Sequence, residues 1–282
     1  TPPIPGSWGG GVPVVRIPAV LARRADAPAD PLADAERQAE SLLAVGTALA
    51  ARQRIDVIHA HTGLPDGIAA LALAERLGVP LVITEHDSTI ASRLDSESIR
   101  AAYRRLTGDG RQLLAVSETL RRQLVMAMGG DEPAIRVVPN IVDVDAFAPG
   151  GYGDRDPDLL LWVGARKVNK GSEVLLEAFR GLRESRPTLR LRLIGRAADP
   201  AEEARLIAFA RDLGVAESVS FEPAADRAGV AAAMAKAAVF VHPSPYETFG
   251  IVAAEALAAG LPVAATPSGG VEEILGADGL CG

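Results

Sequence analysis

Short apolar runs alternate along this chain with longer segments in which apolar residues recur every three or four positions. A bounded run of four to eight apolar residues predicts a buried strand, and a 3.6-residue recurrence predicts an amphipathic helix. Strands that alternate with helices are typical of parallel sheets covered by helices. The pattern therefore predicts an α/β protein.

The alternation is interrupted once, by a segment rich in Gly, Pro and Asp at 148–158 that has the composition of a linker. We expect two doubly wound, Rossmann-like parallel-sheet domains, residues 1–150 and 151–282, that face one another across a cleft. Before the linker, strands are predicted at 13–17, 56–61, 80–84, 112–116 and 135–138, and helices at 32–52, 66–77, 96–106 and 118–128. After it, strands are predicted at 159–163, 189–194, 218–221 and 239–242, and helices at 172–183, 201–213, 227–236 and 250–259.

Composition excludes some classes of function. A length of 282 residues suits two domains, and 48% hydrophobic with 4% aromatic residues predicts aliphatic cores. The net charge of −7 argues against a nucleic-acid surface. Cys281, the single cysteine, permits no internal disulfide and fits a reducing compartment, so we expect a cytoplasmic protein. No apolar run is long enough to span a membrane.

A local basic cluster leaves two interpretations open. It is either a solvated helix face or a contact with anionic lipid at the inner face of the plasma membrane, or with an anionic acceptor. Its members are Arg100, Arg104, Arg105, Arg121 and Arg122.

The segment 238–275 carries the most information about chemistry. Its helix, 250–259, is apolar on every side except at Glu255, and Glu247 lies in the loop that leads into it. A helix of that composition is expected inside the protein, where a lone carboxylate is costly unless it is paired. The N–H groups at a helix start bind anions, and carboxylates accept hydrogen bonds from hydroxyl groups. A nucleoside diphosphate sugar satisfies both features.

The residues from Glu247 to Glu255, Glu-Thr-Phe-Gly-Ile-Val-Ala-Ala-Glu, resemble the Glu-x7-Glu motif of retaining glycosyltransferases with the GT-B fold. The chain is similar to the glycogen-synthase-like family (glycosyltransferase family 4, group 1). The stretches 113–149 and 161–171 also resemble this family, and the resemblance covers about residues 55–278. It implies an acceptor-binding N-terminal domain and a donor-binding C-terminal domain. Because that family has further elements before residue 1 and after residue 282, and the chain starts at Thr1, we expect an internal fragment.

The resemblance assigns roles within segment 238–275. Glu247 is expected to contact the hydroxyl groups of the donor sugar, and Glu255 the ribose. Backbone N–H groups of the loop and first helical turn are expected to meet the sugar and diphosphate, and Gly250 would let the backbone come close. The residues of this group are Thr248, Phe249, Gly250 and Ile251.

A second phosphate site is predicted where a strand ends at Gly164, a basic loop follows and a helix begins after Gly171. Lys170 and Arg166 would neutralise the charge that builds on the departing diphosphate. The family has Arg directly after the glycine and Lys five residues further on. Counted back from Lys170, that Arg position falls on Ala165, one residue before Arg166.

Two other features are candidates with open alternatives. His86 ends a strand, so it is either a hydrogen-bonded loop residue or, as the family resemblance favours, a cleft residue near the sugar; Glu85 and Asp87 are further candidates. The Ser268-Gly-Gly270 segment either presents N–H groups to phosphate or forms a turn.

Three motifs are interpreted as unrelated to the chemistry they superficially suggest. Asp143-Val-Asp145 has the Asp-x-Asp metal pattern, but lies in an interdomain stretch of the family. His59-Ala-His61 alternates as metal ligands do, yet further ligands are few. The loop 164–171 lacks the Gly-Lys-Ser/Thr order of a P-loop, and no Gly-x-Gly-x-x-Gly occurs.

The sequence therefore predicts a metal-independent retaining glycosyltransferase that moves a hexose from a nucleoside diphosphate sugar, UDP before GDP, to an acceptor hydroxyl. The product expected from the resemblance is a cell-envelope glycan, a glycolipid or a small glycoside. The alternatives are a GT-B-like sugar epimerase or phosphorylase, and a sugar-nucleotide-binding fragment without catalysis.

Overall fold

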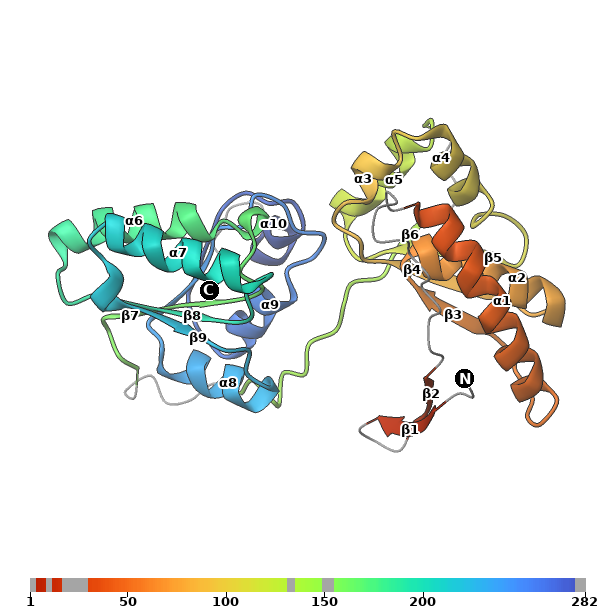
Figure 1. The fold of residues 1–282 in the computed structure, drawn as a ribbon, viewed down its shortest axis with the longest axis horizontal. Helices are drawn as coiled ribbons and strands as arrows, with labels where there is room; N and C mark the ends of the chain where they lie inside the picture. The colour runs from red at the N-terminus through yellow and green to blue at the C-terminus, as the bar shows by residue number, and fades with distance from the viewer. Residues whose placement is uncertain (1–3, 9–11, 17–29, 131–134, 149–154, 277–282) are drawn as a thin grey trace. The chain divides into compact units, whose positions relative to one another are not determined.

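The computed structural model describes residues 4–8, 12–16, 30–130, 135–148 and 155–276, and the chain forms two compact units, Thr1–Val138 and Pro139–Gly282 (Figure 1). The boundary lies 12 residues before the predicted one (150 − 138). The reason is Phe147, which is 2% exposed and packs in the core of the second unit, together with Val142. The segment after Val138 therefore belongs to unit 2.

Unit 1 is built on a four-stranded parallel sheet in which the strands follow their order in the sequence, β3-β4-β5-β6. Ser117 is the N-cap of α5, because its Oγ accepts a hydrogen bond from the Leu120 N–H at 3.1 Å. The strands are β3 (Ile58–His61), β4 (Leu81–Glu85), β5 (Arg111–Ala115) and β6 (Arg136–Val137), and the helices are α1 (Pro31–Ala50), the π-helical turn η1 (Gly63–Gly67), α2 (Ile68–Leu77), α3 (Ile90–Arg93), α4 (Glu97–Arg104) and α5 (Glu118–Ala127).

The strand predicted at 13–17 does not join that sheet. It is β2 (Val12–Arg16), which pairs antiparallel with β1 (Ile4–Trp8) in a separate two-stranded sheet. Only three residues, all glycine, separate β1 and β2 in the sequence. Such a short connection permits an antiparallel hairpin, whereas a parallel pair needs a crossover of a dozen or more residues.

Unit 2 is a five-stranded parallel sheet with the order β11-β10-β7-β8-β9. The order reverses between β7 and β10, as in doubly wound folds, which bind ligands at the carboxyl ends of the strands beside such a reversal. The strands are β7 (Leu159–Val163), β8 (Arg190–Ile194), β9 (Val219–Glu222), β10 (Val239–His242) and β11 (Val263–Ala265). The helical elements are η3 (Val168–Lys170), α6 (Ser172–Ser185), α7 (Pro200–Asp212), η4 (Ala216–Ser218), α8 (Arg227–Lys236), α9 (Ile251–Ala258) and α10 (Gly270–Leu275).

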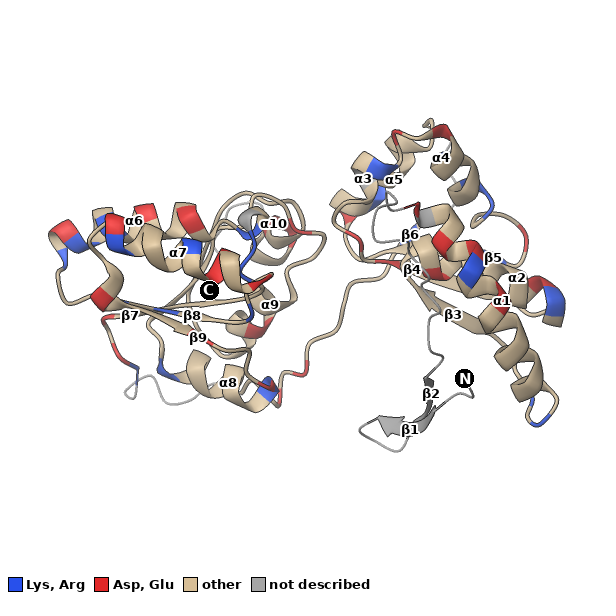
Figure 2. Ribbon diagram, viewed as in Figure 1, with Lys and Arg blue, Asp and Glu red and all other residues tan. Residues whose placement is uncertain are grey.

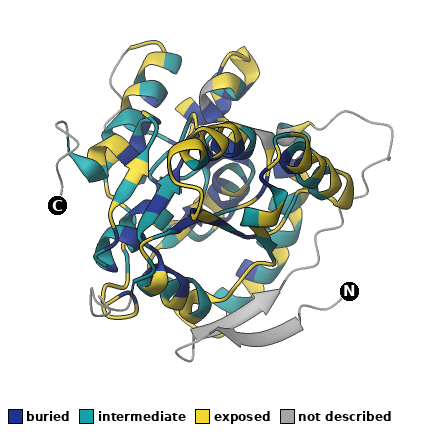
Figure 3. Cartoon of the chain, turned by 90° about the vertical axis from the view of Figure 1, so that its left-hand side faces the viewer, coloured by how far each residue is buried: buried dark blue, intermediate teal, exposed yellow. Residues whose placement is uncertain are grey.

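Alternate residues of β7 point to opposite faces of the unit 2 sheet and enter two separate cores. Leu161 packs with residues of α8 and α9, and Trp162 packs with residues of α6 and α7. Figure 3 shows the buried residues on the strands and on the inward helix faces, and exposed residues on the outer faces. Both faces of the sheet are covered, which is why its central strands are continuous apolar runs.

Candidate functional site

The reversal in the unit 2 sheet brings Lys170 and Glu247 together. Lys170 ends the short helix that follows β7, and Glu247 lies in the loop that follows β10. Lys170 Nζ donates to Glu247 Oε1 at 2.7 Å across 77 residues of sequence. Gly171 permits this approach, because a Cβ there would lie 2.1 Å from the carbonyl oxygen of Pro243. Two of the residues that the sequence assigned to the donor site are thus direct neighbours.

His242, the last residue of β10, is the third member of this group. It is 6% exposed, and its Nε2 lies 3.5 Å from the same Glu247 oxygen. Burial alone raises the pKa of Glu247, but its polar contacts with His242, Lys170 and Ser244, together with the charge of Lys170, outweigh burial and lower the pKa to about 2. Glu247 is therefore an anion at any physiological pH.

Buried polar groups without partners come from the segments that meet at this pair. They are Ser172 Oγ, Ser268 Oγ and both ring nitrogens of His242, for which the 3.5 Å contact is longer than a well-formed hydrogen bond. None of these atoms has a hydrogen-bond partner within the described ranges. Buried polar groups are nearly always satisfied, so these atoms indicate a place where water or a hydroxyl-bearing ligand binds.

The loop into α9 is shaped by packing inside the protein. Gly250 has φ 94°, and a Cβ there would lie 2.4 Å from Val271 Cγ2, so the glycine makes room for Val271; its approach to a ligand stays a prediction. The N–H groups at the start of α9 have no partner within the helix. The ligand contacts of Thr248, Phe249 and Ile251 stay a prediction.

In the segment 268–270 the chain turns from β11 into α10: Gly269 forms a parallel bridge with Glu247, and Gly270 is the first residue of α10. The Gly269 N–H donates to Glu272 Oε2 at 2.8 Å, and the Gly270 N–H donates to the Glu247 carbonyl oxygen at 3.0 Å. A Cβ on Gly270 would lie 2.5 Å from the backbone of Thr248. This turn holds the Glu247 loop in place.

Helix α9 is less buried than its composition predicts. Ala253 and Ala256 are fully buried, but Ile251 is 43% exposed and Glu255 is half-buried. Burial raises the pKa of Glu255, and the charge of Arg227 on α8 opposes this rise. No hydrogen-bond donor to the Glu255 carboxylate is found in the described part of the chain. Glu255 is free to accept one from a ligand.

Arg166 does not lie with Lys170, contrary to the prediction. It is 3% exposed, and its guanidinium donates to both carboxylate oxygens of Glu203 at 2.7–3.0 Å. It also donates to the carbonyl oxygens of Leu193 and Glu222. With its nitrogens engaged in this way, Arg166 joins α7 to the ends of β8 and β9 instead of binding a diphosphate.

Gly164 is also engaged within the protein. Its N–H donates to the carbonyl oxygen of Ile194 at 3.0 Å, so it is not available to a phosphate. Its carbonyl oxygen lies 1.7 Å from where a Cβ on Gly195 would be, and Gly195 has φ 151°. The two glycines let the loops after β7 and β8 touch.

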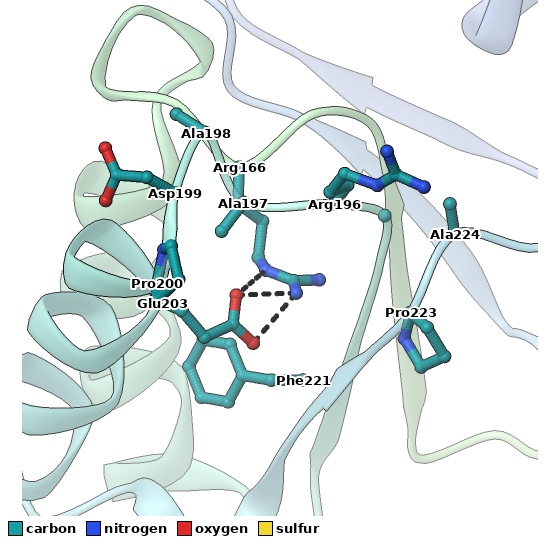
Figure 4. A pocket seen from close by; sticks show the side chains of 11 residues that line it. Arg166, Arg196, Ala197, Ala198, Asp199, Pro200, Glu203, Phe221, Pro223 and Ala224 are labelled. Carbon is teal, nitrogen blue, oxygen red and sulfur yellow. Dashed lines mark hydrogen bonds and ion pairs between the residues drawn. The ribbon is translucent and has the colours of Figure 1, made fainter.

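A cavity of about 600 Å³ lies at the same edge of the sheet, beyond the ends of β8 and β9 (Figure 4). The Arg166–Glu203 pair and Phe221 form one side, and Arg196 extends on the side of Pro223 and Ala224. Since β7 lies between β10 and β8, the cavity and the Lys170–Glu247 pair are neighbours along one edge. No pattern in the sequence indicated this cavity.

His86 lies in unit 1, directly after β4, where it meets a second histidine. His61 Nδ1 and His86 Nε2 are 3.0 Å apart, and the rings of His59 and His61 have centroids 4.5 Å apart. Burial, then the charges of His61 and His59, lowers the pKa of His86. In the described residues no group of three or more His, Cys, Asp or Glu side chains is arranged to hold a metal ion.

The Asp143-Val-Asp145 motif has contacts within its own unit. Asp143 Oδ1 accepts from the Ala146 N–H at 3.1 Å, and Oδ2 lies 3.2 Å from Arg227 Nη1. Asp143 thus closes a turn and pairs with the first residue of α8. These contacts agree with the structural interpretation of the motif.

Four of the five arginines in the predicted basic cluster pair with an acid on their own helix, which favours a solvated helix face. Figure 2 shows a comparable mixture of both signs on α6 and α7. In the described ranges no helix is both long and apolar enough to cross a membrane. The pairs are Arg100–Glu97, Arg104–Glu97, Arg121–Glu118 and Arg122–Glu118.

Two protein-family models match consecutive parts of the chain. The model described as Glycosyltransferase Family 4 matches residues 11–146, and the model described as Glycosyl transferases group 1 matches residues 152–282. The chain belongs to this glycosyltransferase family. The D-inositol 3-phosphate glycosyltransferase of Frankia alni is 35% identical over 252 residues, 80% of this chain and 61% of the relative. That of Nocardiopsis dassonvillei is 35% identical over 249 residues, 80% of this chain and 58% of the relative.

This family member spans about three fifths of the length of those relatives. Solved structures share its fold. Sucrose-phosphate synthase from Thermosynechococcus elongatus gives a TM-score of 0.77 at 21% identity, over 96% of this chain and 69% of that one. HepE from Anabaena, in complex with UDP-glucose, gives a TM-score of 0.71 at 22% identity, over 84% of this chain and 66% of that one.

Proposed function

We propose that unit 2 binds a nucleoside diphosphate sugar, and that the protein transfers the sugar to an acceptor hydroxyl with retention at the anomeric carbon. The observation that carries the proposal is the Lys170–Glu247 pair at the sheet reversal. An ammonium group there offsets diphosphate charge, and the ionised carboxylate accepts hydrogen bonds from sugar hydroxyls. Family membership and the UDP-glucose complex of HepE support this choice of ligand.

The donor would lie along the carboxyl edge of the unit 2 sheet. Its sugar would meet Glu247 and the unpartnered His242, and its diphosphate would meet Lys170 and the start of α9. Its nucleoside would extend toward the 600 Å³ cavity, and Glu255 would accept a hydrogen bond from the ribose. We propose UDP before GDP as the nucleotide of the donor, because UDP is the nucleotide in the HepE structures.

In the reaction, the acceptor oxygen bonds to the anomeric carbon while the bond from that carbon to the diphosphate oxygen breaks. The electron pair goes to the diphosphate, and the hydroxyl proton ends there as well. Lys170 stabilises the charge that develops on this leaving group, which is the largest contribution that the observed residues make. This role needs no divalent cation.

For the acceptor, the relatives suggest a small polyol phosphate. They are D-inositol 3-phosphate glycosyltransferases by name, so a small glycoside is a suitable product to test before a cell-envelope glycan or a glycolipid. His86 in unit 1 would face the acceptor. A reducing, nucleotide-sugar-rich compartment such as the cytoplasm fits the single cysteine.

The donor site is tested by calorimetric titration of UDP, GDP, ADP and uridine. We expect Lys170→Ala to weaken UDP binding about tenfold or more, since one charge-assisted contact to phosphate is lost, and to leave uridine binding unchanged. Glu217→Gln, at an exposed acid of η4, serves as the control. An equal loss for UDP and uridine would contradict the role of Lys170.

Catalysis is tested with UDP-glucose and D-inositol 3-phosphate, with the anomeric configuration of the product read by NMR. Transfer with retention supports the proposal, and an inverted product contradicts it. Epimerised or phosphorolysed sugar without an added acceptor would indicate the first alternative. Binding without turnover of any acceptor would indicate a binding module.

A further inference from the structure

Glu85, the last residue of β4, is a buried acid to which the proposed reaction gives no role. It is fully buried, and its two oxygens accept four hydrogen bonds. Oε1 accepts from the N–H groups of His86 at 2.8 Å and Asp87 at 2.7 Å. Oε2 accepts from the N–H of Gly63 at 2.9 Å and from the Tyr103 hydroxyl at 2.5 Å. Burial raises the pKa of Glu85, and the four hydrogen bonds, all from donors, oppose that rise.

The first loop that Glu85 holds contains backbone strain. Thr62 has φ 72°, a conformation that a β-branched residue rarely adopts, and the Glu85 carboxylate binds the next N–H along the chain. Such strain persists only where surrounding contacts enforce it, and it is common at functional sites. Gly63 is fitted to the same arrangement, because a Cβ there would lie 2.5 Å from the Tyr103 ring.

The second loop that Glu85 holds carries His86. Each loop contributes one ring to the His61–His86 contact of 3.0 Å, since His61 ends β3 one residue before Thr62. This pair lies at the carboxyl edge of the unit 1 sheet, the edge at which α/β sheets bind ligands. The pairing of β4 with β3 and β5 is made by backbone groups. The Glu85 side chain therefore orders the two loops and not the sheet.

We propose that Glu85 is a positioning residue: it fixes the strained Thr62 loop and the His61–His86 pair so that these groups receive the acceptor. This inference rests on the proposed function. Glu85 touches no substrate itself and acts through His86 and the loop backbone. Its loss should therefore impair acceptor use and leave donor binding in unit 2 intact.

The test compares Glu85→Gln with the wild-type chain, because glutamine keeps the size but replaces one acceptor oxygen with an NH₂ group. In assays with UDP-glucose and D-inositol 3-phosphate, we expect the KM for the acceptor to rise about tenfold or more, since small displacements at a site are costly. The Kd for UDP should stay within about twofold of wild type. Glu97→Gln, an exposed acid of α4, is the matched control and should change neither value.

The pH profile separates positioning from a purely structural role. Burial and the charges of His61 and His59 lower the pKa of His86, so we expect the acid limb of kcat/KM in the wild type below the usual range of histidine. Glu85→Gln should move that limb to higher pH, because a released His86 regains solvent. Tyr103→Phe removes only one of the four donors and should leave the limb in place.

Two outcomes would overturn the inference. One is that the wild type transfers sugar, but Glu85→Gln has the same acceptor KM and the same acid limb of kcat/KM as the wild type. The other is a wild type that binds UDP but transfers to no acceptor, which overturns the proposed function as well. If Glu85→Gln does not fold, Thr62→Gly replaces it. Glycine leaves the φ 72° conformation as readily as it adopts it, so the loop is held less firmly. The acceptor KM should therefore rise in this variant as well, and an unchanged value counts against the proposal.

Discussion

Replacement of Glu247 by Gln should destabilise unit 2 in a manner that depends on pH. The pKa of Glu247 is about 2 in the folded protein, against an ordinary value of 4.5. At 1.36 kcal/mol per unit, this lowering corresponds to about 3 kcal/mol of unfolding free energy. Because Lys170 keeps 26% of its side chain exposed, solvent screening reduces the expected value to about 2 kcal/mol.

The sign follows from linkage. An acid whose folded pKa is lowered stabilises the protein above its unfolded pKa and loses that contribution as the pH falls through the folded pKa. The difference between wild type and Glu247→Gln should therefore be largest above pH 5 and shrink between about 4.5 and 2.

The assay is urea unfolding of the full chain across that pH range, followed by tryptophan fluorescence. Trp162 is 2% exposed in a core of unit 2, and a Trp8→Phe background makes it the sole tryptophan. Glu217→Gln provides a matched control at an exposed acid. A difference that stays constant from pH 6 to the acid end, or that changes only above pH 5, would refute the electrostatic account of Glu247.

Other consequences of the structure can be checked separately. Arg166→Ala should lower the unfolding free energy by about 3 kcal/mol, because it leaves Glu203 without its buried partner. The variant should still bind UDP more tightly than uridine. Loss of that preference would show that Arg166 contacts the diphosphate. Gly195→Ala should give little folded protein by circular dichroism, since its Cβ would lie 1.7 Å from the Gly164 carbonyl oxygen, and a normal melt would contradict this. Sugar transfer should continue when EDTA replaces magnesium in the assay. Loss of the transfer rate would show that Lys170 alone does not stabilise the leaving diphosphate.

The elements of the fold were predictable because each depends on local pattern. The runs at β7 and β10 and the helix α8 lie where the apolar spacing places them. The pairing of β2 was not predicted correctly, since an apolar run does not show which strand it joins. The unit boundary depends on the burial of Phe147, a single long-range contact that spacing does not reveal.

The positions of site residues that directly follow strand ends were predictable. The partner of a side chain that has several possible partners was not. Lys170 and Glu247 follow β7 and β10, so the sheet order brings them together. Arg166 is only four residues before Lys170, but its Nη2 pairs with Glu203 Oε2 on α7 at 2.7 Å. The place of His242 in the site could have been predicted, because His242 ends a parallel strand five residues before Glu247.

The reversal of strand order also explains why one carboxylate can serve two purposes. With β7 and β10 adjacent, their following loops must diverge to opposite sides, and Gly171 and Pro243 meet where they separate. In the absence of a ligand, Lys170 and Glu247 neutralise one another there, so neither charge is left half-buried and unpaired. Lysine has three N–H donors, so Lys170 can add a phosphate oxygen without releasing Glu247. The pair that balances charge within unit 2 is then already arranged for the proposed donor.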